Sequence, residues 1–284
     1  MITWFKNPWG KPRALKLITW VYLLWSIVPV SIAVLFAFND GRSRTTWQGF
    51  SLRWFTGESG SVFHDPALQG DLKHTLVLGV ICVVIATPLG VTLALGLQRW
   101  RGRGSGTVNT LMLLPLVTPE IVMGVALLLL VLKVLPWIQL GTTAQAIGQV
   151  TFTLSYVVVI VRGRLVSIGP EYEEAAADLG APPRDQLLRV LFPLLAPAIV
   201  ASAAVVFALS LDDFVVTQYL SGDANTTTVS MQLYATARGA PSPALNALAT
   251  VALLITLATL TFAFFVYKKF AGGNDAAMAA ALEV

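Results

Sequence analysis

The chain has 284 residues, of which 56% are apolar and only 12% are charged, whereas an average soluble domain has about 25% charged residues. Because so few polar residues cannot cover a globular surface, the composition excludes a nucleic-acid-binding protein, a disordered chain and a secreted disulfide scaffold. The single cysteine, Cys82, cannot form a disulfide within the chain, and two histidines leave little for a metal cluster. We therefore predict an all-α membrane protein, since its spans must satisfy their own backbone.

Six segments are long and apolar enough to cross a bilayer core about 30 Å thick, which needs about 20 residues. The fourth segment is the most polar, with Gln145 and Gln149 among its residues, and its ends are the hardest to place. The third contains Pro115 and Pro119 just before Glu120, and we expect a break there because proline frees a backbone carbonyl and bends a helix. The six segments are Leu17–Phe38, Leu76–Leu97, Thr110–Leu132, Ala144–Val161, Leu194–Leu211 and Leu245–Tyr267.

Lysines and arginines indicate the orientation, because they favour the cytoplasmic connections. Thirteen lie on the side of the two termini: Lys6, Lys11, Arg13, Lys16, Arg99, Arg101, Arg103, Arg162, Arg164, Arg184, Arg189, Lys268 and Lys269. Six lie on the other side: Arg42, Arg44, Arg53, Lys73, Lys133 and Arg238. Both termini are therefore expected in the cytoplasm, and this topology explains why the chain is basic, with a net charge of +4.

The expected organisation is a cytoplasmic tail over residues 1–16, a six-span domain over residues 17–267 and a second cytoplasmic tail over residues 268–284. Residues 272–284 are small and polar, and we expect no regular structure there. The first external connection, Asn39–Thr75, is rich in aromatic residues, which favours a place at the membrane interface. It also holds His64 and His74, whose spacing fits no standard metal site.

The fourth connection, residues 162–193, predicts a short acidic helix. Pro170 suits the first helical position, and three carboxylates in the first turn favour the positive end of the helix dipole. Gly180 is a typical stop. We expect a helix of about ten residues, Pro170–Leu179, roughly 15 Å long. The three carboxylates are those of Glu171, Glu173 and Glu174.

Such a short helix is marginal in water, so packing against another surface must hold it. Ala175, Ala176 and Ala177 allow close approach, and the carboxylates accept hydrogen bonds from Arg or Lys. Helices that bind lipid surfaces are usually basic. The acidic composition therefore favours docking on a cytoplasmic protein over docking on the membrane.

This segment resembles the EAA loop of permease subunits of binding-protein-dependent ABC importers. In that loop Glu-Ala-Ala is followed after three residues by Gly and after nine more by Ile-x-Leu-Pro; here Glu174-Ala-Ala is followed by Gly180 and then by Val190-Leu-Phe-Pro193. The resemblance implies the type I importer permease fold, in which this helix couples to a groove of an ATPase subunit. The residues that it assigns to coupling are Glu173, Glu174, Ala175, Ala176, Gly180 and Pro193.

The resemblance also implies the partners. The chain has no G-x-x-x-x-G-K-[ST] phosphate-binding loop, so we expect no ATPase site, no cofactor and no enzymatic activity of its own. ATP and Mg²⁺ would be bound by two copies of a partner ATPase. A second, different permease subunit and an extracytoplasmic substrate-binding protein would complete the importer in the bacterial inner membrane.

A narrower resemblance, to the PotC-like subfamily of spermidine/putrescine permeases, rests on three phrases. They are Trp47-Gln-Gly-Phe-Ser-Leu-Arg-Trp54, Leu211-Asp-Asp-Phe-Val-Val-Thr217 and Ser242-Pro-Ala-Leu-Asn-Ala-Leu-Ala249. A polyamine carries several ammonium groups, so its path should supply carboxylates or aromatic faces. Glu120, within the third span, and Asp212, Asp213 and Tyr219, at the outer end of the fifth, are the candidate path residues.

Several alternatives remain open. The acids have a structural interpretation as well: Asp212 can cap or solvate the end of a span, and Glu120 can pair with a neighbour. The same permease role would also suit thiamine, ferric iron, an opine or another small solute. A secondary transporter would usually show paired structural halves and buried ionisable relays, and an intramembrane enzyme would need a nucleophile and base or a metal cluster. Neither pattern is evident.

Overall fold

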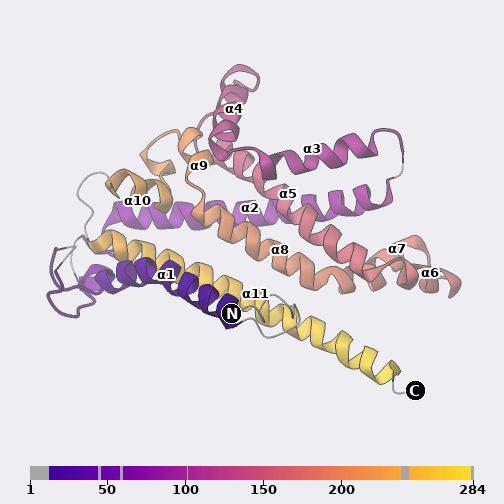
Figure 1. The fold of residues 1–284 in the computed structure, drawn as a ribbon. Helices are drawn as coiled ribbons and strands as arrows, with labels where there is room; N and C mark the ends of the chain where they lie inside the picture. Colours follow the sequence, from indigo (N-terminus) through magenta and orange to yellow (C-terminus); the bar gives the residue numbers. More distant parts are fainter. Residues whose placement is uncertain (1–12, 44–45, 58–59, 101, 238–242, 283–284) are drawn as a thin grey trace. The chain divides into compact units, whose positions relative to one another are not determined.

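The computed structural model describes residues 13–43, 46–57, 60–100, 102–237 and 243–282 (Figure 1). The chain divides into two compact units, one of Met1–Asp65 with Ala240–Val251 and one of Pro66–Gly239 with Ala252–Val284. Several residues used for the orientation and the subfamily resemblance lie outside the described residues: Lys6, Lys11, Arg44, Arg101, Arg238 and Ser242. Residues 1–12 of the N-terminal tail lie outside them as well.

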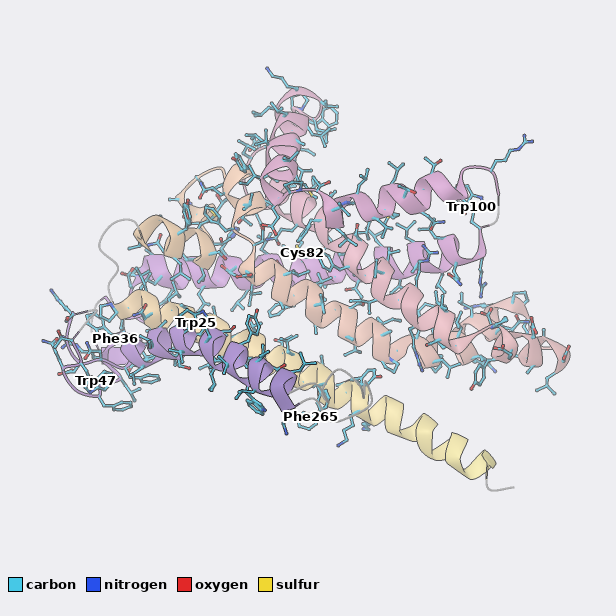
Figure 2. All side chains as sticks on the ribbon, in the orientation of Figure 1. Trp25, Phe36, Trp47, Cys82, Trp100 and Phe265 are labelled. Atoms are coloured by element: carbon cyan, nitrogen blue, oxygen red, sulfur yellow. The ribbon has the colours of Figure 1, made fainter. Side chains whose placement is uncertain are left out.

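The first unit begins with helix α1 (Arg13–Ala37), the expected first span. The loop after it is organised by Asn39, whose Nδ2 donates to Ser43 O at 2.9 Å and whose Oδ1 accepts from the backbone N–H of Gln48 at 2.7 Å. A short π-helix, η1 (Arg53–Gly57), follows. Trp47 and Phe36 form a T-shaped ring pair with centroids 6.4 Å apart (Figure 2). The aromatic connection is thus a folded loop.

The second unit is built on three long helices, α2 (Pro66–Arg99), α5 (Thr142–Ile168) and α8 (Phe192–Asp212). All three pack against one another around a core of buried apolar side chains. α2 begins ten residues before the expected second span, because Pro66 starts a helix well. α5 extends beyond the expected fourth span at both ends, because its polar residues pack against protein rather than lipid.

Close contact between α2 and α5 depends on small residues. Cys82, Ala86, Gly90 and Ala94 recur every fourth position along α2 and are all buried. Residues four apart share one face of a helix, and small side chains let two helices approach closely in lipid. A Cβ added to Gly90 would lie only 2.5 Å from the Cβ of Val157 on α5. Figure 2 shows Cys82 among the packed helices.

The expected third span is broken. It forms α3 (Ser105–Val117) and α4 (Glu120–Lys133), and the chain bends by 111° between them. Thr118 is extended, with φ −72° and ψ 130°. The ring of Pro119 causes this, because a proline disfavours the helical conformation in the residue that precedes it. The break therefore lies at Thr118 and Pro119, as expected, and Pro115 remains inside α3.

The other elements are shorter, apart from the last helix. They are α6 (Glu171–Asp178), α7 (Pro183–Asp185), the π-helix η2 (Gln186–Leu191), α9 (Val215–Tyr219), the 3₁₀ turn η3 (Ala224–Thr226), α10 (Val229–Ala237) and α11 (Pro243–Leu282). The described residues hold five single helices long and apolar enough to span a membrane, and the bent α3–α4 pair makes six if it is counted as one span. The expectation that residues 272–284 lack regular structure is wrong as far as Leu282, because alanine is the best helix former and five alanines lie in this stretch after Asp275.

The Gly90 contact gives a test of the packing. Gly90→Ala should lower the melting temperature of the detergent-solubilised protein, because overpacking a core typically costs ~1–3 kcal/mol. Gly96→Ala is the matched control: it lies on the same helix with open space around its Cβ position. That change should be neutral or stabilising by up to about 1 kcal/mol. Equal melting temperatures for the two variants would contradict the close α2–α5 contact.

Candidate functional site

Helix α6 is the acidic helix expected from the sequence, with tighter bounds. It has eight residues, Glu171–Asp178, and Pro170 and Leu179 are its cap residues. Both Glu173 and Glu174 donate their backbone N–H groups to Pro170 O at 3.0 Å. The three carboxylates of its first turn lie at the positive end of the helix dipole, where a negative charge is stabilising.

The end of α6 is fixed by Gly180. Its φ of 81° is left-handed, a conformation that costs other residues roughly 1–2 kcal/mol. Gly180 N donates to Ala177 O at 2.8 Å and Ala181 N donates to Ala176 O at 3.0 Å. These two bonds form a Schellman motif, which satisfies carbonyls that the helix end would leave unpaired.

The motif residues of α6 divide between two faces. Glu173 and Ala176 are half-buried, whereas Glu174 and Ala175 are exposed. The Glu173 carboxylate pairs with the guanidinium of Arg99, the last residue of α2. Such a partly exposed pair is worth at most about 1 kcal/mol, so it orients α6 without anchoring it firmly.

Two further features leave α6 accessible. Leu179, directly after the helix, is 90% exposed. A cavity of about 490 Å³ lies between α6 and the ends of α2 and α5, with Gln98, Leu165 and Glu173 among its lining residues. α6 is therefore a short protruding helix with an acidic outer face and an exposed apolar residue directly after its end.

Pro193 lies in the first turn of α8, after η2. A proline inside a helix removes a hydrogen bond and clashes with the carbonyl four residues earlier. The wider π-helical turn over Gln186–Leu191 is the kind of irregularity that relieves such a clash. Residues Pro183–Asp212 therefore continue as one span of 30 residues, so the chain is helical from just after Gly180 to Asp212.

At the other end of α8 the chain leaves the helix at Asp213, which caps the next one. Asp213 Oδ1 accepts the backbone N–H of Val216 at 3.2 Å, and Oδ2 accepts that of Thr217 at 3.0 Å. The capping role considered for Asp212 therefore belongs to Asp213. Asp212 itself is the exposed last residue of α8.

Glu120 and Tyr219 lie beside Asp213. Glu120 is the first residue of α4, directly after the break, rather than the middle of a continuous span. α4 packs against α9, whose first turn is capped by Asp213. Tyr219, at the end of α9, packs on Gly124, one turn beyond Glu120, where an added Cβ would lie 2.7 Å from Tyr219 Cδ2. The structure thus brings Glu120, Asp213 and Tyr219 into one region, which we call the acidic cluster.

Sequence reasoning missed the amides beside this cluster. Gln149 Nε2 donates to Asp213 Oδ2 at 3.2 Å. Gln145, one turn earlier on α5, donates to Thr217 O at 3.0 Å and to Thr226 O at 2.9 Å. Their four-residue spacing in an apolar segment was the available signal, because it places two amides on one face of a helix.

The histidines make ordinary hydrogen bonds. His74 Nε2 lies 2.8 Å from Gln145 Oε1, and His64 Nδ1 lies 3.1 Å from Ser61 Oγ. Within the part of the chain that the structure describes, no group of three or more His, Cys, Asp or Glu side chains is placed to hold a metal ion.

Residues 86–272 match the family described as "Binding-protein-dependent transport system inner membrane component". The chain is 32% identical over 247 residues to the spermidine/putrescine transport system permease protein PotC of Escherichia coli (strain K12), covering 87% of this chain and 91% of that protein. It is also 32% identical over 253 residues to the putrescine transport system permease protein PotI of the same strain, covering 87% and 86%.

The fold has solved counterparts as well. It is similar to a chain in the crystal structure of a bacterial ABC transporter involved in the import of the acidic polysaccharide alginate, with a TM-score of 0.72. That likeness covers 90% of this chain and 94% of the other at 18% identity. The architecture of an importer permease therefore extends over nearly the whole chain.

Proposed function

We propose, since this chain belongs to the family of binding-protein-dependent transport system inner membrane components, that it is a permease subunit of an ATP-driven importer whose cargo is a polyamine. The observation that carries this proposal is the connection between the two functional regions. A single helical stretch, Pro183–Asp212, joins the protruding α6 to the acidic cluster.

The coupling step follows from that connection. When ATP closes two ATPase subunits, their grooves move, and α6 moves with the groove in which it docks. Gly180 fixes the angle between α6 and the following helical stretch, so displacement of α6 is passed to α7, η2 and α8. The far end of α8 carries Asp212 and Asp213, so the same displacement changes the position of the acidic cluster.

The exposed outer face of α6 supports a protein partner. Glu174 and Ala175 face outward, and an acidic surface with a small-residue patch suits a groove that supplies Arg or Lys. The partner ATPase, in two copies, would bind ATP and Mg²⁺, because this chain has no phosphate-binding loop of its own. A second permease subunit and an extracytoplasmic binding protein complete the proposed assembly.

The charge distribution sets the proposed orientation. α6 and most of the basic residues would lie in the cytoplasm, and both termini with them, in a bacterial inner membrane. The acidic cluster then lies toward the opposite side, where cargo arrives from the binding protein.

The acidic cluster supports a cationic cargo. The region holds two acidic side chains, Glu120 and Asp213, and a carboxylate attracts a cation. Tyr219 adds an aromatic face, which attracts ammonium groups. The relatives named for spermidine and putrescine transport agree with that chemistry. A cargo such as ferric iron, thiamine or an opine has a different charge and shape, so competition by these solutes distinguishes them from a polyamine.

Coupling is tested at Gly180 and Glu174. In the assembled complex in proteoliposomes, Gly180→Pro should abolish the ATP hydrolysis stimulated by loaded binding protein, because proline cannot adopt a φ of 81°. Gly180→Asn should retain most of it, since asparagine tolerates this conformation. Glu174→Lys should also uncouple the complex by reversing a charge on the outer face of α6.

The control for Glu174→Lys is Glu171→Lys, which places the same charge in the first turn of the same helix. Normal stimulated hydrolysis in Gly180→Pro and in Glu174→Lys would contradict the coupling role of α6. Loss of the complex itself is checked by co-purification of the subunits before hydrolysis is measured.

The cargo path is tested by neutralising the acids. Asp213→Asn, Asp212→Asn and Glu120→Gln should each lower uptake of radiolabelled spermidine, and Asp213→Asn should do so by roughly ten- to hundredfold, as expected for a lost interaction between charged groups. Stimulated ATP hydrolysis should remain. Unchanged uptake in all three variants would remove Asp212 and the acidic cluster from the path. Uptake that excess thiamine or ferric ion suppresses, and excess putrescine does not, would contradict the polyamine cargo.

A further inference from the structure

Beside the acidic cluster, Gln149 joins four segments of the chain through one side chain. Its Nε2 donates to Asp213 Oδ2 at 3.2 Å and to Ser210 O at 3.3 Å. Its Oε1 accepts from Ser210 Oγ at 2.5 Å and from Cys82 Sγ at 3.0 Å. Gln149 thus links α5 to α2, to α8 and to the residue at which the chain leaves α8.

This set of bonds fixes the direction of the amide. A glutamine has two N–H donors and a carbonyl oxygen with two lone pairs, and all four positions are used here. The two groups that face Nε2, the Asp213 carboxylate and the backbone carbonyl of Ser210, accept hydrogen bonds, so only one assignment of the amide oxygen and nitrogen fits. The Nε2 group must therefore point toward Asp213.

Asp213 is held in turn. An ionised carboxylate has about four lone-pair positions, and three of them accept N–H groups from Gln149, Thr217 and Val216. Oδ2 accepts two of these donors and Oδ1 accepts one. The second lone-pair position of Oδ1 is used neither by Gln149 nor by the first turn of α9. It can therefore accept a further donor, such as an ammonium group.

A comparison within the same helix shows what is particular to Gln149. Gln145 lies one turn earlier, is also buried, and also joins several segments through His74, Thr217 and Thr226. Gln145 makes no hydrogen bond to a carboxylate. Both amides hold the helices together, and Gln149 in addition holds a charged group of the cargo path.

We propose that Gln149 is a positioning residue of the cargo path, which sets the direction of the Asp213 carboxylate while Ser210 and Cys82 lock its own amide. This inference rests on the proposed function, because it assumes that Asp213 meets the cationic cargo. Without Gln149 the carboxylate keeps only its two bonds to the first turn of α9, so Oδ2 is held less firmly in the direction that suits the path. Cargo would then be released backward more often during each cycle of ATP hydrolysis.

The test measures the number of spermidine molecules imported per ATP hydrolysed, with the assembled complex in proteoliposomes and loaded binding protein in excess. A purely structural defect lowers uptake and stimulated hydrolysis together and leaves their ratio unchanged. Gln149→Leu should lower the ratio about three- to tenfold. Gln145→Leu, the matched control, should leave the ratio within about twofold of wild type even where both rates fall.

Two gentler variants keep the test decisive if Gln149→Leu does not fold. Gln149→Met keeps the length of the side chain and adds no charge beside Asp213 but removes both donors, and it should lower the ratio as Gln149→Leu does. Ser210→Ala removes one hydrogen bond that orients the Gln149 amide and should lower the ratio about two- to threefold. Its control is Ser202→Ala, two turns earlier in α8, whose Oγ bonds only to Ile199 O within the helix; this variant should behave as wild type.

Asp213→Asn separates failure of this inference from failure of the proposed function. If Asp213→Asn lowers the ratio and Gln149→Leu adds nothing further to it, the positioning role is supported. If Asp213→Asn lowers the ratio while the Gln149 and Ser210 variants leave it unchanged, the positioning role is overturned and the cargo path stands. An unchanged ratio in Asp213→Asn overturns both. Equal effects of the Gln149 and Gln145 variants also overturn the positioning role.

Discussion

The close approach of α2 and α5 is the constraint on which both proposed functional regions, α6 and the acidic cluster, depend. Lipid tails are as apolar as leucine, so helices in a membrane gain little from hiding apolar surface and must gain from close contact. The small residues Ala86, Gly90 and Ala94 supply that contact along α2. The two helices run parallel, since His74 meets Gln145, Cys82 meets Gln149 and Gly90 meets Val157 in order. One end of this pair carries Arg99, which orients α6, and the other carries the amides beside Asp213.

The backbone is irregular next to both proposed functional regions. Pro119 ends a helix and puts Glu120 at the start of the next one, α4, which packs against α9. Pro193 and the π-helical η2 lie where α6 connects to α8. Non-helical backbone at membrane depth needs partners within the protein, and the Asp213 carboxylate supplies one set for the first turn of α9. Breaks in the helices are thus paired with polar side chains that satisfy them.

Much of the helical architecture could be predicted from the sequence. The spans follow from runs of apolar residues, the break at Pro119 from the steric effect of proline, and the stop at Gly180 from glycine's access to the left-handed region. The bend of 111° between α3 and α4 could not, because the angle depends on how α4 packs against α9. The helical course of α11 through residues 272–282 was missed because two glycines and a polar stretch outweighed the alanines that follow them.

The acidic cluster was predicted only as a set of residue types. Glu120, Asp213 and Tyr219 come from three elements, and their meeting depends on tertiary packing that no local pattern contains. The capping of α9 by Asp213 rather than by Asp212 depends on which of two adjacent carboxylates faces inward after α8 ends. The sequence showed Gln149 as a polar residue in the most polar of the six expected spans. Its partners Cys82 and Ser210, however, lie more than 60 positions away along the chain in either direction.

Site-specific crosslinking at Leu179 tests the central claim, that α6 docks on an ATPase, most directly. Leu179 is 90% exposed at the end of α6, so a photoreactive amino acid placed there in native membranes should react with whatever covers this turn. We expect one protein adduct whose partner is an ATPase with a phosphate-binding loop, with a yield that changes when ATP is trapped. The same probe at Phe262, an exposed apolar residue of α11, should form no ATPase adduct. Capture of lipid alone at Leu179, while the subunits still co-purify, would contradict docking of α6 on an ATPase.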